Sequence, residues 1–337
     1  MVSVFPYRSI AIVSLFVLLT MFGCGSGERK TVWIESGIEY RLQYCCLFLT
    51  PEVGLWGGEK GENAYCWKTT DGGQHWQQKK LEGGVLKDLT EQDGVVYATV
   101  ERREKDTLLY THSVYTSCDQ GESWQLKCEM VTEEAFIDLV VLDSMRMFMV
   151  LLSSLLETRD GGEKWQIARN DWCRKVSMDD KYLYYMIHRR SPEDILIDCL
   201  VRRSLKSGKE RLLKFPAGVD LEETCGNVIL LEKEQCIRSY RIEENMSLTF
   251  LGKLNQKAYS VDYMSRCGEQ LFAHLFIDIC THKLFHSPDG GIHWEYAGKN
   301  MTGAPVCMQA DSTHVRIFIL NGPYYLQSYT HKRIGAD

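Results

Sequence analysis

Short runs of apolar and β-branched residues recur along the chain, and each run ends at a turn rich in Gly, Asp or Ser. One group of runs is Val85–Thr90, Val95–Glu101, Leu108–Ser117 and Trp124–Cys128. The runs have the length of strands and lack the 3.6-residue period of an amphipathic helix. The pattern therefore predicts an all-β chain of short antiparallel strands.

One turn sequence occurs four times, in the form Ser/Thr-x-Asp-x-Gly-x-x-Trp. In a tight turn between antiparallel strands, the Asp carboxylate can accept hydrogen bonds from backbone N–H groups, and the Gly can take a positive φ. The Trp then packs a large ring against neighbouring residues. The copies are Thr69, Asp71, Gly73 and Trp76; Ser117, Asp119, Gly121 and Trp124; Thr158, Asp160, Gly162 and Trp165; and Ser287, Asp289, Gly291 and Trp294.

The spacing of the copies indicates a repeat of about 43 residues. The first three begin 48 and 41 residues apart, and the third and fourth are separated by 129 residues, which leaves room for two degenerate copies. Candidates are Ser204–Arg211 and Ser239–Glu243, with a further one at Ser328–Thr330. Strands repeating at this period are typical of propeller blades.

The four turns resemble the Asp-box (BNR) repeat of sialidase-like β-propellers. The resemblance implies a β-propeller of four-stranded antiparallel blades. The seven repeat positions, degenerate ones included, imply a seven-bladed β-propeller, although the degenerate copies also leave six blades possible. The last predicted blade has three strands, Val306–Ala310, His314–Leu320 and Tyr324–Ser328. We expect the N-terminal segment Thr31–Glu35 to supply the fourth and close the ring, because closure removes exposed sheet edges.

The N-terminal residues read as a targeting segment. Residues 1–23 combine Arg8 with an apolar run that is too short to span a bilayer, as in a signal peptide. Cys24 and the polar residues after it resemble a bacterial lipoprotein site, with 24–30 as a lipidated tether; a plain secretory signal is the alternative. The propeller domain is then 31–337, on a protein that is exported and lipid-anchored to the cell envelope.

Composition limits the partners and the chemistry. A net charge of −6 argues against a nucleic-acid partner, which would require a basic face. Twelve cysteines besides Cys24 permit disulfides, but none has zinc-site spacing with another cysteine or a histidine, and we expect no metal and no cofactor. Several are expected to be free and buried on or beside inner strands, namely Cys45, Cys46, Cys225, Cys267 and Cys307.

The topology of a four-stranded blade separates two faces. All four Asp turns join the third and fourth strands, so they should lie on one face, where we expect their carboxylates to be structural. The opposite face is formed by the loops between second and third strands and by the linkers between blades. Its candidate binding residues are Arg41, Arg102, Arg103, His188, Arg189 and Arg190.

Two functions follow from the resemblance. A sialidase would require three arginines on the substrate carboxylate, a Tyr–Glu pair and an acid/base Asp, and only Arg41 in Tyr40–Gln43 matches that pattern. We therefore predict no catalytic residues and favour a monomeric, non-catalytic propeller that binds or scaffolds a protein or glycan. Relatives of the photosystem II assembly factor are similar in architecture. A sialidase-like exo-glycoside hydrolase remains the alternative.

Overall fold

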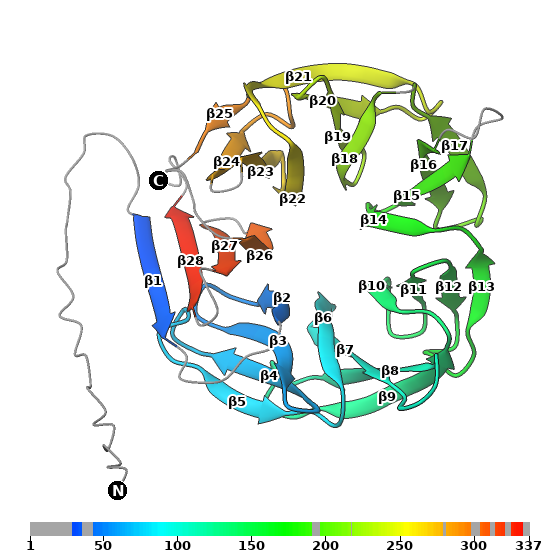
Figure 1. Ribbon diagram of the computed structural model, residues 1–337, viewed down its shortest axis with the longest axis vertical. Helices are drawn as coiled ribbons and strands as arrows, with labels where there is room; N and C mark the ends of the chain where they lie inside the picture. Colours follow the sequence, from blue (N-terminus) through cyan, green and yellow to red (C-terminus); the bar gives the residue numbers. More distant parts are fainter. Residues whose placement is uncertain are drawn as a thin grey trace, which may run out of the picture.

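The chain forms a ring of seven four-stranded antiparallel sheets (Figure 1). This computed structural model describes residues 29–35, 43–190, 196–216, 218–278, 281–297, 304–310, 314–320 and 325–332. Within these ranges every regular element is a strand, and no helix there is long and apolar enough to cross a membrane. The predicted seven-bladed β-propeller is confirmed. Arg41, Cys24 and the predicted signal peptide lie outside the described residues.

The blades follow one another along the chain, with strands running in order from the centre of the ring to its rim. Blade one contains β2 (Gln43–Phe48), β3 (Gly54–Lys60), β4 (Asn63–Thr69) and β5 (Gln77–Lys80). Blade two contains β6 (Val85–Gln92), β7 (Val95–Arg103), β8 (Tyr110–Ser117) and β9 (Gln125–Thr132). Blade three contains β10 (Phe136–Val141), β11 (Met147–Leu151), β12 (Leu155–Thr158) and β13 (Gln166–Arg169).

The next three blades repeat this order. Blade four contains β14 (Cys173–Met178), β15 (Tyr182–Arg190), β16 (Leu196–Ser204) and β17 (Glu210–Lys214). Blade five contains β18 (Asp220–Cys225), β19 (Val228–Lys233), β20 (Cys236–Ile242) and β21 (Leu248–Lys257). Blade six contains β22 (Ser260–Cys267), β23 (Gln270–Asp278), β24 (Thr281–Ser287) and β25 (Glu295–Tyr296).

Blade seven joins the two ends of the described chain. Its strands are β26 (Ala304–Ala310), β27 (His314–Leu320), β28 (Tyr325–Lys332) and, at the rim, β1 (Arg29–Glu35). Strand β1 pairs antiparallel with β28 from Arg29↔His331 to Glu35↔Tyr325 (Figure 1). The predicted closure by the N-terminal strand is therefore confirmed, and it leaves blade seven with the same four strands as the others.

The core lies between blades rather than at one centre. The second strands are covered on both sides by neighbouring sheets, and β11 is buried along its whole length with the sequence Met-Phe-Met-Val-Leu. The rim strand β9 is instead exposed or half-buried at every position. Each apolar cluster combines residues of adjacent blades, as where Leu55 of blade one packs with Leu86 and Val96 of blade two. Stacking of blades thus builds one continuous core.

Each innermost strand departs from regular pairing with the second strand of its blade. The register shifts near Cys45, Asp88, Asp138, Ser177, Glu223, Tyr263 and Cys307. A bulge bends its strand and re-aims the extra side chain. In blade six the extra residue is Asp262, which lies between the paired residues Val261 and Tyr263.

Three details of the sequence analysis are wrong, and one of them is the degenerate turn predicted at Ser328–Thr330, which lies within β28. Ser239 lies in the middle of β20 rather than in a turn, and the corresponding turn of blade five runs from 243 to 247. The period placed Ser239 a few residues too early because the turn of blade five has neither the Asp nor the Trp to mark it. Cys46 is disulfide-bonded, whereas we expected a free thiol. Cys45 is free and buried as expected, Cys225 and Cys267 are free but only half-buried, and the side chain of Cys307 lies outside the part of the structure that is described.

Candidate functional site

The four Asp turns share one hydrogen-bond pattern. In blade two, the Ser117 hydroxyl donates to Asp119 Oδ1 (2.7 Å) and accepts from the Gly121 N–H (2.7 Å). The same carboxylate accepts from the Ser123 N–H (2.8 Å) and the Ser123 hydroxyl (2.5 Å). Equivalent bonds join Thr69 to Asp71, Thr158 to Asp160 and Ser287 to Asp289. These bonds occupy the carboxylates, since each accepts several N–H or O–H donors from its own turn.

The hydrogen bonds also set the charge state of the aspartates. Burial is the largest single influence on Asp71 and Asp289 and opposes their ionisation, but the hydrogen bonds from His75 and His293 and from the Thr or Ser of each turn together outweigh it and lower the pKa of each carboxyl to about 2. Hydrogen bonds from Ser123 and Lys164 likewise hold the pKa values of Asp119 and Asp160 below their usual range. All four are therefore ionised at neutral pH, a state suited to accepting hydrogen bonds rather than to donating a proton.

The Asp turns contact the rest of the ring in two directions. Within a blade, the N–H of Gly72, Gly161 or Gly290 donates to a carbonyl in the turn between the first two strands. Toward the preceding blade, Gly162 has φ of 101° and lies so close to Cys128 that a Cβ there would collide with its side chain. The Trp294 Nε1–H donates to the Gly291 carbonyl (3.0 Å) and to the Ser239 hydroxyl of blade five (3.1 Å).

Blade four carries the degenerate turn predicted at Ser204–Arg211. The Gly208 N–H donates to the Ser204 carbonyl (2.8 Å), and Gly208 has φ of 68°. The turn thus keeps the Ser and Gly positions without an Asp. Ser328, the third candidate, lies within β28 and pairs with Val32.

The opposite face is defined here as the loops between second and third strands together with the linkers between blades. Arg102 and Arg103 end β7 at this face, and His188, Arg189 and Arg190 end β15 there. Arg102 pairs with Glu104 through Nε and Nη2, both at 3.0 Å from Oε1. Arg189 is exposed, with Nη2 4.0 Å from Asp171. This face therefore presents charged side chains from blades two and four.

His188 differs from its neighbours because its side chain is only 6% exposed. Its Nδ1 lies 2.7 Å from Asp198 Oδ1, and its ring contacts Trp172 edge-on with centroids 5.7 Å apart. Burial, together with Arg174, lowers the pKa of His188 despite Asp198. His188 therefore supports the loop and Trp172 rather than offering a free surface to a ligand.

Large apolar side chains are exposed among these charges. Leu108 is 73% exposed in the β7–β8 loop, Trp172 is 51% exposed in the linker between blades three and four, and Tyr259 is 63% exposed before β22. A hollow of about 640 Å³ is lined by residues 103–108 of that β7–β8 loop. Sequence analysis named the charges but not the apolar residues, which carry no motif.

Three arginines do converge on one carboxylate, but the carboxylate belongs to the protein. Glu157 in β12 accepts from Arg146 Nε (2.9 Å), Arg159 Nε (2.9 Å) and Arg203 Nη2 (3.1 Å). Arg203 continues to Glu210, which accepts from the Tyr185 hydroxyl (2.6 Å). Glu157 and Tyr185 are buried between blades three and four, so this Arg, Tyr and Glu constellation is not open to a substrate.

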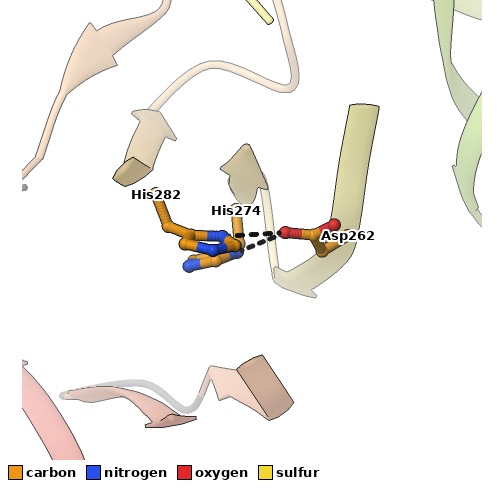
Figure 2. Close-up of side chains that lie close together, drawn as sticks. All are labelled: Asp262, His274 and His282. Carbon is orange, nitrogen blue, oxygen red and sulfur yellow. Dashed lines mark hydrogen bonds and ion pairs between the residues drawn. The ribbon is translucent and has the colours of Figure 1, made fainter. Parts of the chain in front are cut away.

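Blade six brings together one aspartate and two histidines (Figure 2). Asp262 comes from β22, His274 from β23 and His282 from β24, and Nδ1 of each histidine lies 3.2 Å from Asp262 Oδ2. The imidazole rings stack with centroids 5.1 Å apart. One donor atom from each residue lies within 4.8 Å of the other two, so the group could hold a metal ion. The sequence alone does not reveal this group, because strand register rather than sequence spacing brings the three residues together.

The chain is similar to solved structures through its fold alone. No protein-family model and no curated protein matches the sequence. The β-propeller domain of the Trilobed protease from Pyrococcus furiosus aligns with a TM-score of 0.60 at 8% identity, covering 86% of this chain and 96% of that one. Streptogramin B lyase aligns with a TM-score of 0.59 at 8% identity, covering 89% and 97%.

A third structure is a puromycin-hydrolyzing peptidase of Mycobacterium tuberculosis. It aligns with a TM-score of 0.59 at 10% identity over 89% of this chain, but this chain spans only about half of that one, 53%. At these identities the likeness establishes the β-propeller fold and no activity, because one fold supports many functions.

Proposed function

We propose that this chain is a cell-envelope β-propeller that binds a protein partner through the face opposite the Asp turns. The Asp turns are its structural Asp-box repeats, and a lipid on Cys24 anchors it to the membrane. It acts as a binding or scaffolding module rather than as a hydrolase, and it needs no catalytic residue.

The observation that carries the proposal is the exposure of apolar side chains on the face opposite the Asp turns, where Leu108 and Tyr259 are more exposed than Met145 and Ile292 are on the Asp-turn face. The Asp-turn carboxylates are occupied by their own turns, whereas Leu108, Trp172 and Tyr259 are exposed among charged residues on the other face. Aromatic and aliphatic side chains surrounded by polar groups are typical of protein-binding surfaces. The aliphatic Leu108 favours a protein over a glycan, for which aromatic stacking alone would suffice.

The alternative hydrolase has weaker support. The arginines that converge on a carboxylate surround the buried Glu157, and the Tyr–Glu pair beside them is enclosed between blades. A sialidase site would need the three arginines and the Tyr–Glu pair to be open to a substrate at the centre of the ring. Turnover of a fluorogenic sialoside by the purified chain would support the hydrolase and argue against our proposal.

The test is capture of a partner from envelope extracts, with two sets of variants. Leu108→Ser with Trp172→Ser removes exposed apolar side chains from the proposed binding face. Met145→Ser with Ile292→Ser is the matched control, because these residues are exposed at turns on the Asp-turn face. Loss of two central contacts should weaken capture about 30-fold, as for hot-spot residues.

We expect quantitative mass spectrometry to show one protein enriched by the native chain and by the control but not by the binding-face variant. Equal capture by all three proteins would contradict the proposed face. If both variants melt as the native chain does but capture less partner to the same extent, binding does not depend on one face, and this result would also contradict the proposal.

A further inference from the structure

We infer that Asp262, His274 and His282 form a binding site for a divalent transition-metal ion of the zinc class. The inference is independent of the proposed docking function, because it rests on the donor atoms of blade six (Figure 2). Two imidazoles and one carboxylate are a donor set that binds Zn²⁺ or Fe²⁺ and leaves coordination positions open for water.

The distances fit a shared ion. Each His Nδ1 lies 3.2 Å from Asp262 Oδ2. Donor atoms bonded to one tetrahedral ion at about 2.0–2.2 Å are separated by roughly 3.3 Å. A hydrogen bond between a charged imidazole and a carboxylate is shorter, about 2.7–2.9 Å. The observed spacing between each histidine and Asp262 is therefore close to that of two ligands of one ion, and it also matches an ordinary N–H···O hydrogen bond.

The burial of His274 gives a second observation. Its side chain is fully buried, and its Nε2 has no hydrogen-bond partner among the described residues. Its Nδ1 is the nitrogen that faces Asp262. The buried ring therefore holds this nitrogen in place at the proposed ion.

Carboxyl groups of the neighbouring blade lie near the site. Glu223 is on the innermost strand β18 of that blade, which contacts β22. Glu222, also on β18, accepts from the N–H of Val261, the residue before Asp262 (2.7 Å). Lys175 is the cation that balances Glu223, at 3.0 Å. Glu222 therefore lies against the strand that carries Asp262, and Lys175 lies against Glu223.

The site is also accessible from solvent. The Asp262 side chain is 23% exposed and that of His282 is 8% exposed, while His274 closes the inner side. Asp262 is near the start of β22 and His282 near the start of β24, so the group lies toward the face opposite the Asp turns. An ion could therefore enter from that face.

The test is Co²⁺ and Zn²⁺ binding by the purified full chain. We expect one Co²⁺ per chain, with visible absorption bands that Zn²⁺ abolishes, and Zn²⁺ should raise the melting temperature as a ligand of the folded state does. Asp262→Asn keeps the shape of the side chain, and His282→Gln replaces the ring by a polar side chain. Each should weaken binding by at least about tenfold, the loss seen even for groups that only support ligands.

His188→Gln is the matched control, because His188 and Asp198 form a histidine–aspartate pair at the same end of blade four. It should bind Co²⁺ as the native chain does. Melting curves in chelator establish whether each variant is folded. The inference would be overturned if folded Asp262→Asn or His282→Gln bound Co²⁺ as tightly as the native chain does. It would also be overturned if His188→Gln were the one variant that lost Co²⁺ binding.

Discussion

At the scale of single residues, the Ser or Thr of each turn matters as much as the Asp. Thr69, Ser117, Thr158 and Ser287 are all buried, and each hydroxyl both donates to the carboxylate and accepts from the Gly N–H. Without that hydroxyl, the buried N–H of the Gly would have no acceptor in its turn. The hydroxyl and the carboxylate therefore hold the turn together, the first through the Gly N–H and the second through the N–H groups that follow it.

We predict that Ser117→Ala destabilises the fold by about 1–3 kcal/mol, the cost of leaving a buried polar group unpaired. The measurement is urea unfolding of the native chain and the variant. Ser123→Ala is the control, because Ser123 is exposed in the same turn and its loss removes only an exposed hydrogen bond. An Ser117→Ala protein as stable as the control would refute this role for the hydroxyl.

At the scale of elements, the contact between blades three and four combines apolar packing with an ion-pair network. Phe148 of β11 packs with Leu183 and Tyr185 of β15. Arg146 and Arg203 also lie over the Phe148 ring, at 5.5 and 6.0 Å. Glu157 joins both arginines at the centre. Because Glu157 is buried, its removal would leave Arg146 without its acidic partner, whereas Arg203 would keep Glu210.

We predict that Glu157→Gln lowers the free energy of unfolding by about 3 kcal/mol at pH 7, as when one partner of a buried ion pair is removed. Urea unfolding measures the loss. Glu62→Gln is the control. The side chains of Glu62 and Lys105 are each more than 80% exposed, so their ion pair should contribute less than about 1 kcal/mol to the free energy of unfolding.

The stability difference between the native chain and Glu157→Gln should depend on pH. Burial alone would raise the pKa of Glu157, but hydrogen bonds from Arg159 and Arg146 outweigh it and hold the pKa below the usual 4.5. A lowered pKa means that the stabilisation is present above pH 4.5 and is lost as the pH falls through the folded-state value. The stability difference between native chain and Glu157→Gln should therefore shrink at acid pH. A constant difference would exclude ionised Glu157 as its cause.

The sequence predicts elements better than it predicts contacts between them. Strands β8, β12 and β24 end at the Ser or Thr of a turn, so the motif marks their ends directly. In blade five no such marker exists, and Ser239 was assigned to a turn although it lies within β20. The group of Asp262, His274 and His282 depends on a bulge and on strand register, neither of which the residue pattern reveals.

At the scale of the whole molecule, ring closure makes the two faces fixed and distinct. Strand β1 completes blade seven, and Gln309 of β26 joins blade one by accepting from the Phe48 N–H (2.6 Å) and donating to its carbonyl (2.7 Å). Every Asp turn then lies on one face, and the loops with Leu108 and Trp172 lie on the other. A partner that docks on a closed ring should cover one face only.

Hydrogen exchange of the chain, free and bound to its captured partner, tests this division most directly. We predict that binding slows exchange in 103–109 and 170–173 on the proposed binding face and leaves the Asp turns 71–76, 119–124 and 289–294 unchanged. Slower exchange in the Asp turns, with no change in 103–109 or 170–173, would contradict the account.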